Sequence, residues 1–394
     1  MDNKEFINKH LNDDVNKLAL SKFPEDIDRD FVIRQIHARQ VLSKKLPSWA
    51  ENDELIFPKN LSLEYCSSEL TAKYKATLIK GKTLIDLTGG MGVDTAFLSD
   101  NYEKTFYVEM QEELCEIAKH NFKVLNKNIE VVNDNAEHFL KICDKVDCIY
   151  LDPARRDEYG RKMVSLHDCM PDVVELHDML LEKAKTILIK VSPMLDIEMV
   201  KKELKDISAI HVLSVRNECK EILIEIQKLS VPASQPLSIS TTDLRENWNF
   251  TFAENEESDA QWTLADNIGK YLYEPGVACM KAGCFKLLSQ KYSLSKLHRN
   301  SHLYTSDKLV SDFPGRIFEL IEVFPFDKKT KKEITSLLSQ QHKLKASIAT
   351  RNFPLSAEEL KKNLGLQDGS DFYIFGTTLK GEKKVVIMTK KTLV

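Results

Sequence analysis

The 394-residue sequence lacks the features that mark membrane, secreted and repeat proteins. No run of about eighteen apolar residues occurs, so we expect no membrane-spanning helix. The first residues, MDNKEFINKHLNDDV, contain neither an apolar stretch nor a small-residue cleavage site, so we expect no secretory signal peptide. There is also no internal repeat and no low-complexity segment. With a hydrophobic content of 42%, these absences indicate a soluble globular protein.

The sequence also has no CxxC pair, although it contains eight cysteines. These are Cys66, Cys115, Cys143, Cys148, Cys169, Cys219, Cys279 and Cys284. Zinc sites usually pair cysteines at short spacing, so we expect no metal. Several of the cysteines lie in strand-like runs. We therefore expect reduced thiols and a cytoplasmic protein.

Basic residues are slightly fewer than acidic ones overall, and they are enriched near the C-terminus. The formal net charge is −4, but residues 321–394 hold 14 Lys and Arg against 8 Asp and Glu, a net charge of +6. That leaves 42 of the 56 basic and 52 of the 60 acidic residues for the remaining chain, a net charge of −10. A basic segment on an acidic body favours a polyanion such as RNA. The alternative is that these lysines only solubilise a small domain.

The hydrophobic pattern changes near residue 83, from helical spacing to short strand-like runs that alternate with helical ones. Residues 1–75 carry apolar residues at spacings of three and four, which predicts helices. Strand-like runs follow at 83–88, 105–110, 129–133, 147–152, 186–192, 210–216 and 221–227. Helical patterns separate the first six, which predicts a doubly wound, Rossmann-like α/β sheet of seven strands. Only NECK separates the last two strands, so they must pair antiparallel.

Composition changes again after residue 228. LSVPASQPLSISTTD, residues 229–243, is rich in proline and serine and predicts a linker leading into a β segment. We expect four regions: N-terminal helices over 1–75, the doubly wound domain over 76–230, a linker and small domain over 231–316, and a small α+β domain over 317–394.

A glycine-rich turn follows the first strand, in LIDLTGGMGVDT. Asp86 comes first, and then Gly89, Gly90 and Gly92 let the backbone turn tightly and approach a ligand. Glu109 ends the second strand, 23 residues after Asp86, where an acid can bind the ribose hydroxyls of an adenosine-containing ligand. The alternatives are glycines that serve only packing and an exposed acid at a strand end.

A nicotinamide dinucleotide and S-adenosylmethionine both fit this pattern, and three features favour the second. The dinucleotide fingerprint GxGxxG would need glycine at position 95, which is Thr95. Asp86 lies where the ammonium of an amino-acid moiety would need neutralising. The sheet ends in a short hairpin. Asp134 or Asn135, after the third strand, could bind the adenine amino group or could simply form a turn.

The fourth strand runs into LDPARR. Ligands of doubly wound sheets lie over the carboxyl ends of the strands, so Asp152 should face the methyl donor, with Pro153 fixing the backbone after it. The Asp152 carboxylate can take a proton or hydrogen bond from a nucleophilic amine. Arg155 and Arg156 are planar donors suited to phosphate or a base edge. Alternatively, Asp152 caps a helix and the arginines pair with nearby acids.

Two further charged residues could contact a substrate. Lys190 ends the fifth strand, and Glu218 lies in the predicted hairpin turn. Each also has a plain structural interpretation: Lys190 could be a solvated residue at a strand end, and Glu218 could simply form the turn.

Four segments of the sheet region, DLTGGMGVDT, LDPARRD, IKVSPMLDI and NECKEIL, resemble the class I S-adenosylmethionine-dependent methyltransferases that carry a THUMP-like C-terminal domain. CSSELTAKYKA and YEPGVACMKAG extend the resemblance beyond the sheet. The resemblance implies a ferredoxin-like domain within 231–316, a THUMP-like domain over 317–394, and, by analogy, methylation of RNA such as tRNA or rRNA. It does not imply which base is modified.

DPAR departs from related motifs of nucleic-acid methyltransferases, because Ala154 replaces a second proline and no aromatic follows to stack a flipped adenine. The leading interpretation is transfer of a methyl group to a base nitrogen in RNA. The alternatives are a nicotinamide-dependent oxidoreductase, a non-catalytic RNA-binding protein that keeps the fold, and a methyltransferase for proteins or small molecules. The sequence leaves the oligomeric state open.

Overall fold

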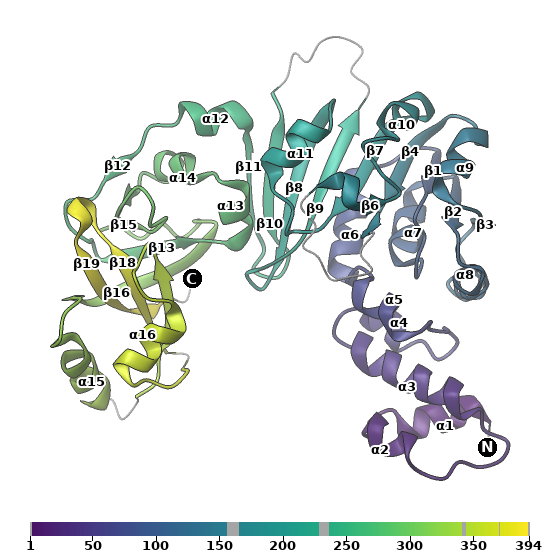
Figure 1. The fold of residues 1–394 in the computed structure, drawn as a ribbon, viewed down its shortest axis with the longest axis horizontal. Coiled ribbons are helices and arrows are strands. Elements are labelled where there is room, and N and C mark those ends of the chain that lie inside the picture. Colours follow the sequence, from purple (N-terminus) through teal and green to yellow (C-terminus); the bar gives the residue numbers. More distant parts are fainter. Residues whose placement is uncertain (1, 156–164, 228–235, 341–343, 370, 393–394) are drawn as a thin grey trace. The chain divides into compact units, whose positions relative to one another are not determined.

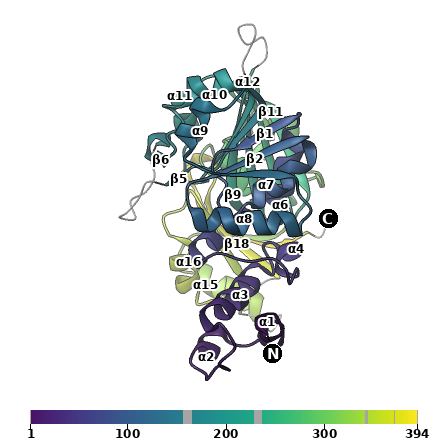
Figure 2. The same ribbon diagram turned by 90° about the vertical axis from the view of Figure 1, so that its right-hand side faces the viewer.

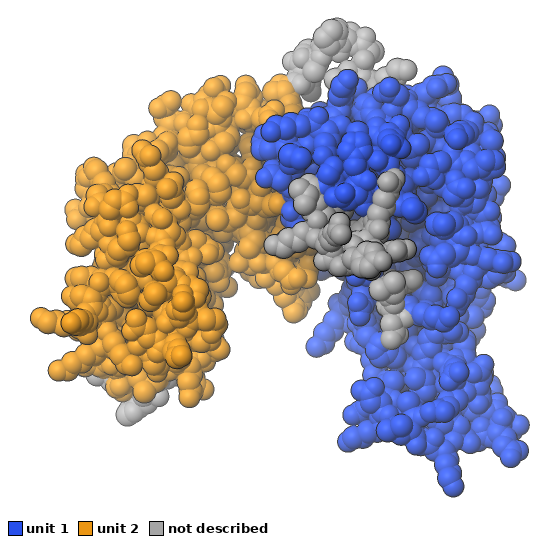
Figure 3. All heavy atoms as spheres, in the orientation of Figure 1, with its two compact units in different colours: residues 1–210, 221–234 blue, residues 211–220, 235–394 orange. Residues whose placement is uncertain are grey.

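A computed structural model describes residues 2–155, 165–227, 236–340, 344–369 and 371–392. The chain forms two compact units (Figure 3). Residues 1–210 and 221–234 make the first unit, and residues 211–220 and 235–394 make the second.

The first unit begins with helices, as the sequence predicts (Figure 1). They are α1 (Asn3–His10), α2 (Val15–Ala19), α3 (Arg29–Leu42), α4 (Pro47–Ala50), α5 (Asn60–Tyr65) and α6 (Glu69–Leu78). Asp2, Asp14 and Asp28 cap the first three helices, each accepting backbone N–H groups of the first turn. Ser68 caps α6 by accepting from Thr71 N at 3.2 Å.

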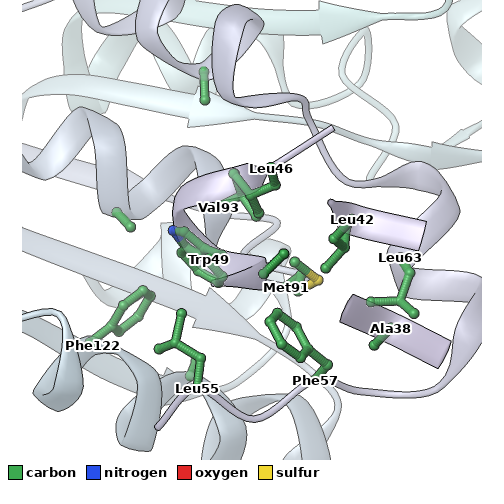
Figure 4. Packing of buried hydrophobic residues seen from close by; sticks show 14 of the residues in the cluster. Ala38, Leu42, Leu46, Trp49, Leu55, Phe57, Leu63, Met91, Val93 and Phe122 are labelled. Atoms are coloured by element: carbon green, nitrogen blue, oxygen red, sulfur yellow. The ribbon is translucent and has the colours of Figure 1, made fainter. Parts of the chain in front are cut away.

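From α3 onward these helices pack against the glycine turn, whereas α1 and α2 pack with the first half of α3 in a separate cluster. Leu46, Trp49 and Leu55 share one buried cluster with Met91 and Phe122 (Figure 4). Met91 lies within the glycine turn. Helices α3 to α6 therefore share a hydrophobic core with that turn, and burial of large apolar side chains there stabilises it by about 1.5–3 kcal/mol each.

The sheet of the first unit contains the predicted parallel strands. They are β1 (Thr83–Asp86), β2 (Lys104–Glu109), β3 (Ile129–Asn133), β4 (Val146–Leu151) and β7 (Ala184–Val191), and β9 (Glu218–Gln227) pairs antiparallel with β7. The order is β3-β2-β1-β4-β7-β9, with β1 central and parallel to both β2 and β4. The order reverses between β1 and β4, so their carboxyl ends form the switch point at which doubly wound sheets bind ligands.

Helices cover both faces of this sheet. They are α7 (Val93–Leu98), α8 (Glu112–Val124), α9 (Ala136–Ile142), α10 (His177–Lys183) and α11 (Ile197–Glu203). In Figure 2, α6, α7 and α8 lie on one side of the strands, and α9, α10 and α11 lie on the other. The prediction of a doubly wound sheet is confirmed. Short elements complete this unit: η1 (Ser99–Asn101), β5 (Ala154–Arg155), η2 (Leu166–Asp168) and β6 (Cys169–Met170).

The predicted hairpin is present, with a tighter turn than NECK suggests. β8 (Ile207–Val215) and β9 are joined by Arg216 and Asn217, whose φ angles are 54° and 59°. Two consecutive residues with positive φ are typical of a type I′ turn. Glu218 therefore begins a strand, and the prediction that it lies in the turn is wrong.

The sheet continues beyond this hairpin with β10 (Ser238–Asp243) and β11 (Trp248–Ala253), giving nine strands in the order β11-β10-β8-β9-β7-β4-β1-β2-β3. The sequence predicts a linker over 229–243, and this is wrong for Ser238–Asp243. β10 pairs antiparallel with β11, and the Ser240 and Thr251 hydroxyls lie 3.0 Å apart across the pair. Strand residues that hydrogen-bond through hydroxyls give a polar composition, which resembles that of a linker.

The second unit holds an eight-stranded sheet in the order β12-β14-β15-β13-β16-β19-β18-β17. Its strands are β12 (Thr263–Leu264), β13 (Tyr271–Pro275), β14 (Ser295–Lys296), β15 (Tyr304–Ser306), β16 (Gly315–Pro325), β17 (Ser347–Arg351), β18 (Phe372–Thr378) and β19 (Lys384–Lys391). Its helices are α12 (Glu254–Asp259), α13 (Val277–Ala282), α14 (Phe285–Lys291), α15 (Thr330–Gln340), α16 (Ala357–Leu364) and η3 (Lys380–Glu382). β16 pairs with both β13 and β19, so the expected boundary after residue 316 falls inside a strand of one continuous sheet.

Within the described ranges, no helix has the length and apolar character needed to cross a bilayer. In the same residues, no group of three His, Cys, Asp or Glu side chains is arranged to hold a metal ion.

Candidate active site

The Asp86 carboxylate, at the end of β1, accepts two hydrogen bonds that stabilise the turn after this strand. Its Oδ2 accepts a hydrogen bond from Thr95 Oγ1 at 2.5 Å, and its Oδ1 accepts one from Thr88 N at 3.0 Å. Asp86 is only 1% exposed. This burial raises the pKa of Asp86 to about 7, against the opposing hydrogen bonds from Thr95 and Thr88, with Asp94 and Asp152 adding negative charge nearby.

The three glycines of the turn are required for different reasons. A Cβ at Gly89 would lie 2.2 Å from the Tyr107 ring, and one at Gly92 would lie 2.8 Å from the Phe122 ring. Gly90 has a φ of +54°, and a Cβ there would meet nothing closer than 3.8 Å. Gly89 and Gly92 thus serve packing, whereas the backbone at Gly90 is open to close approach by a ligand.

Glu109, at the end of β2, binds this turn directly. Its Oε2 accepts a hydrogen bond from Gly90 N at 3.0 Å, and its Oε1 accepts one from Gln111 N at 2.9 Å. Each carboxylate oxygen has a second lone pair, so the group can accept further hydrogen bonds from two hydroxyls. The side chain is fixed in place and still able to bind a ribose.

Asp134 and Asn135 follow β3 with different roles. Asn135 caps α9, since its side-chain oxygen accepts from His138 N at 2.8 Å. Asp134 N donates to Glu109 O at 3.2 Å, and Asp134 Oδ2 lies 2.6 Å from His138 Nδ1. Of the two, Asp134 is therefore the better placed beside Glu109.

Asp152 lies immediately after β4, next to the glycine turn. Its backbone N–H donates to Thr88 Oγ1 at 2.6 Å, and its Oδ2 accepts a hydrogen bond from Lys190 Nζ. The Asp152 side chain is 35% exposed. Residues 154–155 form β5, which pairs with β6, so Asp152 does not cap a helix in the described part of the chain.

Beneath this surface lies a second group of buried charges. Lys75 is fully buried, and its Nζ lies 2.8 Å from Glu221 Oε1, 2.9 Å from Ser67 Oγ and 3.2 Å from Asp94 Oδ1. Asp94 Oδ2 also accepts hydrogen bonds from the Ser67 and Tyr150 hydroxyls, both at 2.7 Å. Burial opposes ionisation of Asp94, but Lys75 and Lys190 outweigh it and the pKa of Asp94 is lowered.

Several of the residues predicted from the sequence are joined, through Thr88, in one continuous chain of contacts from β3 to β7. Asp134 contacts Glu109, Glu109 contacts Gly90, and Thr88 of the same turn contacts Asp152, which contacts Lys190. The carboxyl ends of the parallel strands thus carry one connected polar site.

In the part of the chain that the structure describes, that series of contacts does not include Arg155, Arg156, Glu218 or Pro153. Arg156 lies outside the described residues, as does the side chain of Arg155, so the roles of both stay predictions. Glu218 is exposed at the start of β9, and its Oε1 lies 2.6 Å from Lys220 Nζ. Pro153 follows Asp152 and is half-buried.

The sequence did not reveal the buried partners Lys75, Asp94 and Glu221. Lys75 lies one helical turn after Ala72, on the buried face of α6. This helical spacing from a buried residue is the signal in the sequence that could have indicated a buried lysine. Its partner Glu221 is 146 residues away, so no local pattern could have paired them.

Three protein families match parts of the chain. Residues 69–208 match a family described as conserved hypothetical protein 95. Residues 271–314 match a ferredoxin-like domain, and residues 315–391 match a THUMP domain-like family. No protein with a curated description matched the chain.

Solved structures include one relative of the whole chain. This is the crystal structure of a Porphyromonas gingivalis W83 protein assigned as a methyltransferase. Its sequence is 33% identical to this chain, the match covers 99% of this chain and 98% of the relative, and the TM-score is 0.87. An rRNA methylase from Streptococcus thermophilus is 16% identical over 41% of this chain and 96% of its own, with a TM-score of 0.31. A Streptococcus mutans protein assigned as a methyltransferase, solved with S-adenosylhomocysteine, is 19% identical over 41% and 97%, also at 0.31.

Proposed function

The chain belongs to the methyltransferase family that carries ferredoxin-like and THUMP-like domains, and on that premise we propose that it transfers a methyl group from S-adenosylmethionine to a base nitrogen in RNA. The observation that carries the proposal is the contact between Thr88 of the glycine turn and Asp152. It brings together a turn suited to an adenosine ligand and a carboxylate suited to an amine.

The residues at the turn fit the proposed cofactor. Gly90 leaves its backbone uncovered, and Glu109 can accept the two ribose hydroxyls while keeping its bonds to the turn. Asp134 would accept the adenine amino group. Asp86, which we expected to neutralise the ammonium, is bonded to Thr95 and Thr88, so its contribution to binding comes through the shape of the turn.

When bound, S-adenosylmethionine would supply an electrophilic methyl group, and its sulfur would keep the electrons of the carbon–sulfur bond that breaks. The acceptor nitrogen would supply the electron pair of the new carbon–nitrogen bond. Asp152 would accept the hydrogen that this nitrogen loses and pass the proton to solvent, while Pro153 restricts the backbone beside it. The main tasks of the protein are therefore positioning and proton acceptance.

Two observations support RNA as the substrate. Residues 315–391 match a THUMP domain-like family, and THUMP domains bind RNA. Residues 321–394 carry a net charge of +6 on an otherwise acidic chain, which favours a polyanion. Arg155 and Arg156, next to Asp152, would contact phosphate or a base edge, and Glu218 would bind substrate from β9.

The proposal is tested by comparing methylated nucleosides in total RNA from a strain lacking this gene with those of its parent. We expect one methylated nucleoside to disappear, to return with the parent gene, and to stay absent with Asp152→Asn. Identical nucleosides in both strains, together with methyl transfer from purified protein into a protein or small-molecule fraction, would contradict RNA as the substrate.

A further inference from the structure

Lys190, near the end of β7, has an ammonium group that is largely withdrawn from solvent. Its side chain is 13% exposed, and its Nζ donates to Asp152 Oδ2. Burial would lower the pKa of Lys190, but Asp152, Glu221 and Asp94 outweigh it, so that pKa is raised and the ammonium stays charged. The cation beside Asp152 is therefore permanent at physiological pH.

The neighbouring acids have a cation of their own. Lys75 lies 2.8 Å from Glu221 Oε1 and 3.2 Å from Asp94 Oδ1. Lys190 is thus left to interact chiefly with Asp152. Within the described residues, no donor is bonded to the second oxygen of that carboxylate, Oδ1.

We propose that Lys190 is a positioning residue that acts through Asp152: it holds Oδ2, and so leaves Oδ1 to accept the hydrogen of the acceptor nitrogen. This replaces the expectation that Lys190 binds substrate itself. It rests on the proposed function in one respect, because Asp152 must be the group that meets the acceptor.

The charges around the pair explain why a cation is needed there. Asp86, Asp94 and Glu221 lie close enough to influence the two side chains, and Tyr150 OH is bonded to Asp94 beneath them. Without the Lys190 ammonium, an ionised Asp152 would lie among these acids with Lys75 already bound to two of them. Its carboxylate would then be repelled and free to rotate.

The test is a double-mutant cycle of Lys190→Met, Asp152→Asn and the combined variant, with Lys190→Arg as the conservative change. Lys185→Met is the matched control, because Lys185 lies on the same strand but is 80% exposed and pairs with Asp147 at 2.6 Å. Each protein is measured for the free energy of unfolding in urea, the Kd for RNA and the single-turnover rate.

We expect Lys190→Met to lower the single-turnover rate at least about tenfold while the RNA Kd changes less than about twofold. The combined variant should be no slower than Asp152→Asn, and Lys190→Arg should recover part of the rate. In unfolding, Lys190→Met should be destabilising in the parent and less so beside Asp152→Asn. Lys185→Met should leave the rate unchanged.

A higher RNA Kd in Lys190→Met, equal in both backgrounds, would overturn the proposal and make Lys190 a substrate ligand. Additive unfolding free energies would also overturn it, since the two side chains would then act independently. The unfolding cycle needs no methyl transfer. If the parent protein proved inactive, that result would contradict the proposed function, and the coupling of Lys190 with Asp152 would still be decided.

Discussion

The Thr88 hydroxyl accepts a 2.6 Å hydrogen bond from the backbone N–H of Asp152. Thr88 belongs to the glycine turn after β1, and its own N–H donates to Asp86. One residue therefore fixes the distance between the turn expected to hold the cofactor and the carboxylate expected to meet the acceptor. Cofactor binding and methyl transfer can nevertheless be separated, because Glu109 and Asp152 lie at the ends of different strands.

Glu109 should control cofactor affinity. Glu109→Gln keeps the shape but loses the charge that favours hydroxyl donors, so we expect micromolar S-adenosylhomocysteine binding in the parent to weaken at least about tenfold. Gly90→Ala should weaken it as well, because φ is +54° and the Cβ would enter the open space above the turn. Isothermal titration calorimetry measures both.

The control for Gly90→Ala is Gly283→Ala, where φ is +76° and a Cβ would meet nothing within 4 Å. This substitution also places a side chain at a residue with positive φ, but in the second unit, so it should destabilise the backbone similarly and leave cofactor affinity unchanged. NADH binding to the parent, without binding of either sulfur compound, would contradict the assignment of this turn to S-adenosylmethionine.

Asp86 should make stability fall as pH rises. Its pKa is raised to about 7 by burial, whereas an aspartate in the unfolded chain titrates near about 4. Between these values the folded state holds a proton that the unfolded state has released, so stability is greatest below the lower value and is lost as pH rises through the upper one. The free energy of unfolding of Asp86→Asn, relative to that of the parent, should therefore rise by up to about 1.4 kcal/mol per pH unit from pH 5 to 7. Above pH 7 this difference should level off.

Urea unfolding at pH 5, 6, 7 and 8 measures this difference. Asp147→Asn is the control, because Lys185 and backbone N–H groups lower the pKa of Asp147 to about 2, and its difference from the parent should stay constant over this range. A constant difference for Asp86→Asn would show that Asp86 is already ionised at pH 5.

Exposed lysines around α15 should contribute RNA affinity by binding phosphates. Lys328, Lys329, Lys331 and Lys332 are all exposed, and reversing them to glutamate should weaken RNA binding. The dependence of log K on log salt should become shallower by about 0.7–0.9 for each phosphate that the protein no longer neutralises. Cofactor affinity should not change.

Reversing Lys9, Lys17, Lys22 and Lys44, which are exposed in the N-terminal helical region, is the matched control and should leave RNA affinity unchanged. Substitution is preferable to deleting residues 321–394, because β16 pairs with both β13 and β19 and would be cut. RNA affinity that survives the reversal at α15 would show that this surface does not bind RNA.

Much of the fold could be predicted because its signals are local. The strands that end at Asp86, Glu109 and Leu151 are short apolar runs, and the glycines mark the turn between β1 and α7. β10 was missed because its serines and threonines hydrogen-bond across a strand pair, which gives it the composition of a linker.

The buried partners could not be predicted, because they are paired over long separations. Lys75, Asp94, Lys190 and Glu221 come from α6, α7, β7 and β9, and Asp152 follows β4. Each lies in a separate motif of the sequence, from CSSELTAKYKA to NECKEIL, and only the folded sheet brings those motifs together.

The role of Asp152 is tested most directly by the single-turnover rate of methyl transfer to RNA in Asp152→Asn. The substitution keeps the size of the side chain but removes the proton acceptor, so the rate should fall at least about a hundredfold. Affinity for S-adenosylmethionine should change less than about twofold, because Glu109 and the glycine turn are intact. A rate within about threefold of the parent, in a variant that still binds both RNA and the cofactor, would contradict the assignment of Asp152 to the reaction.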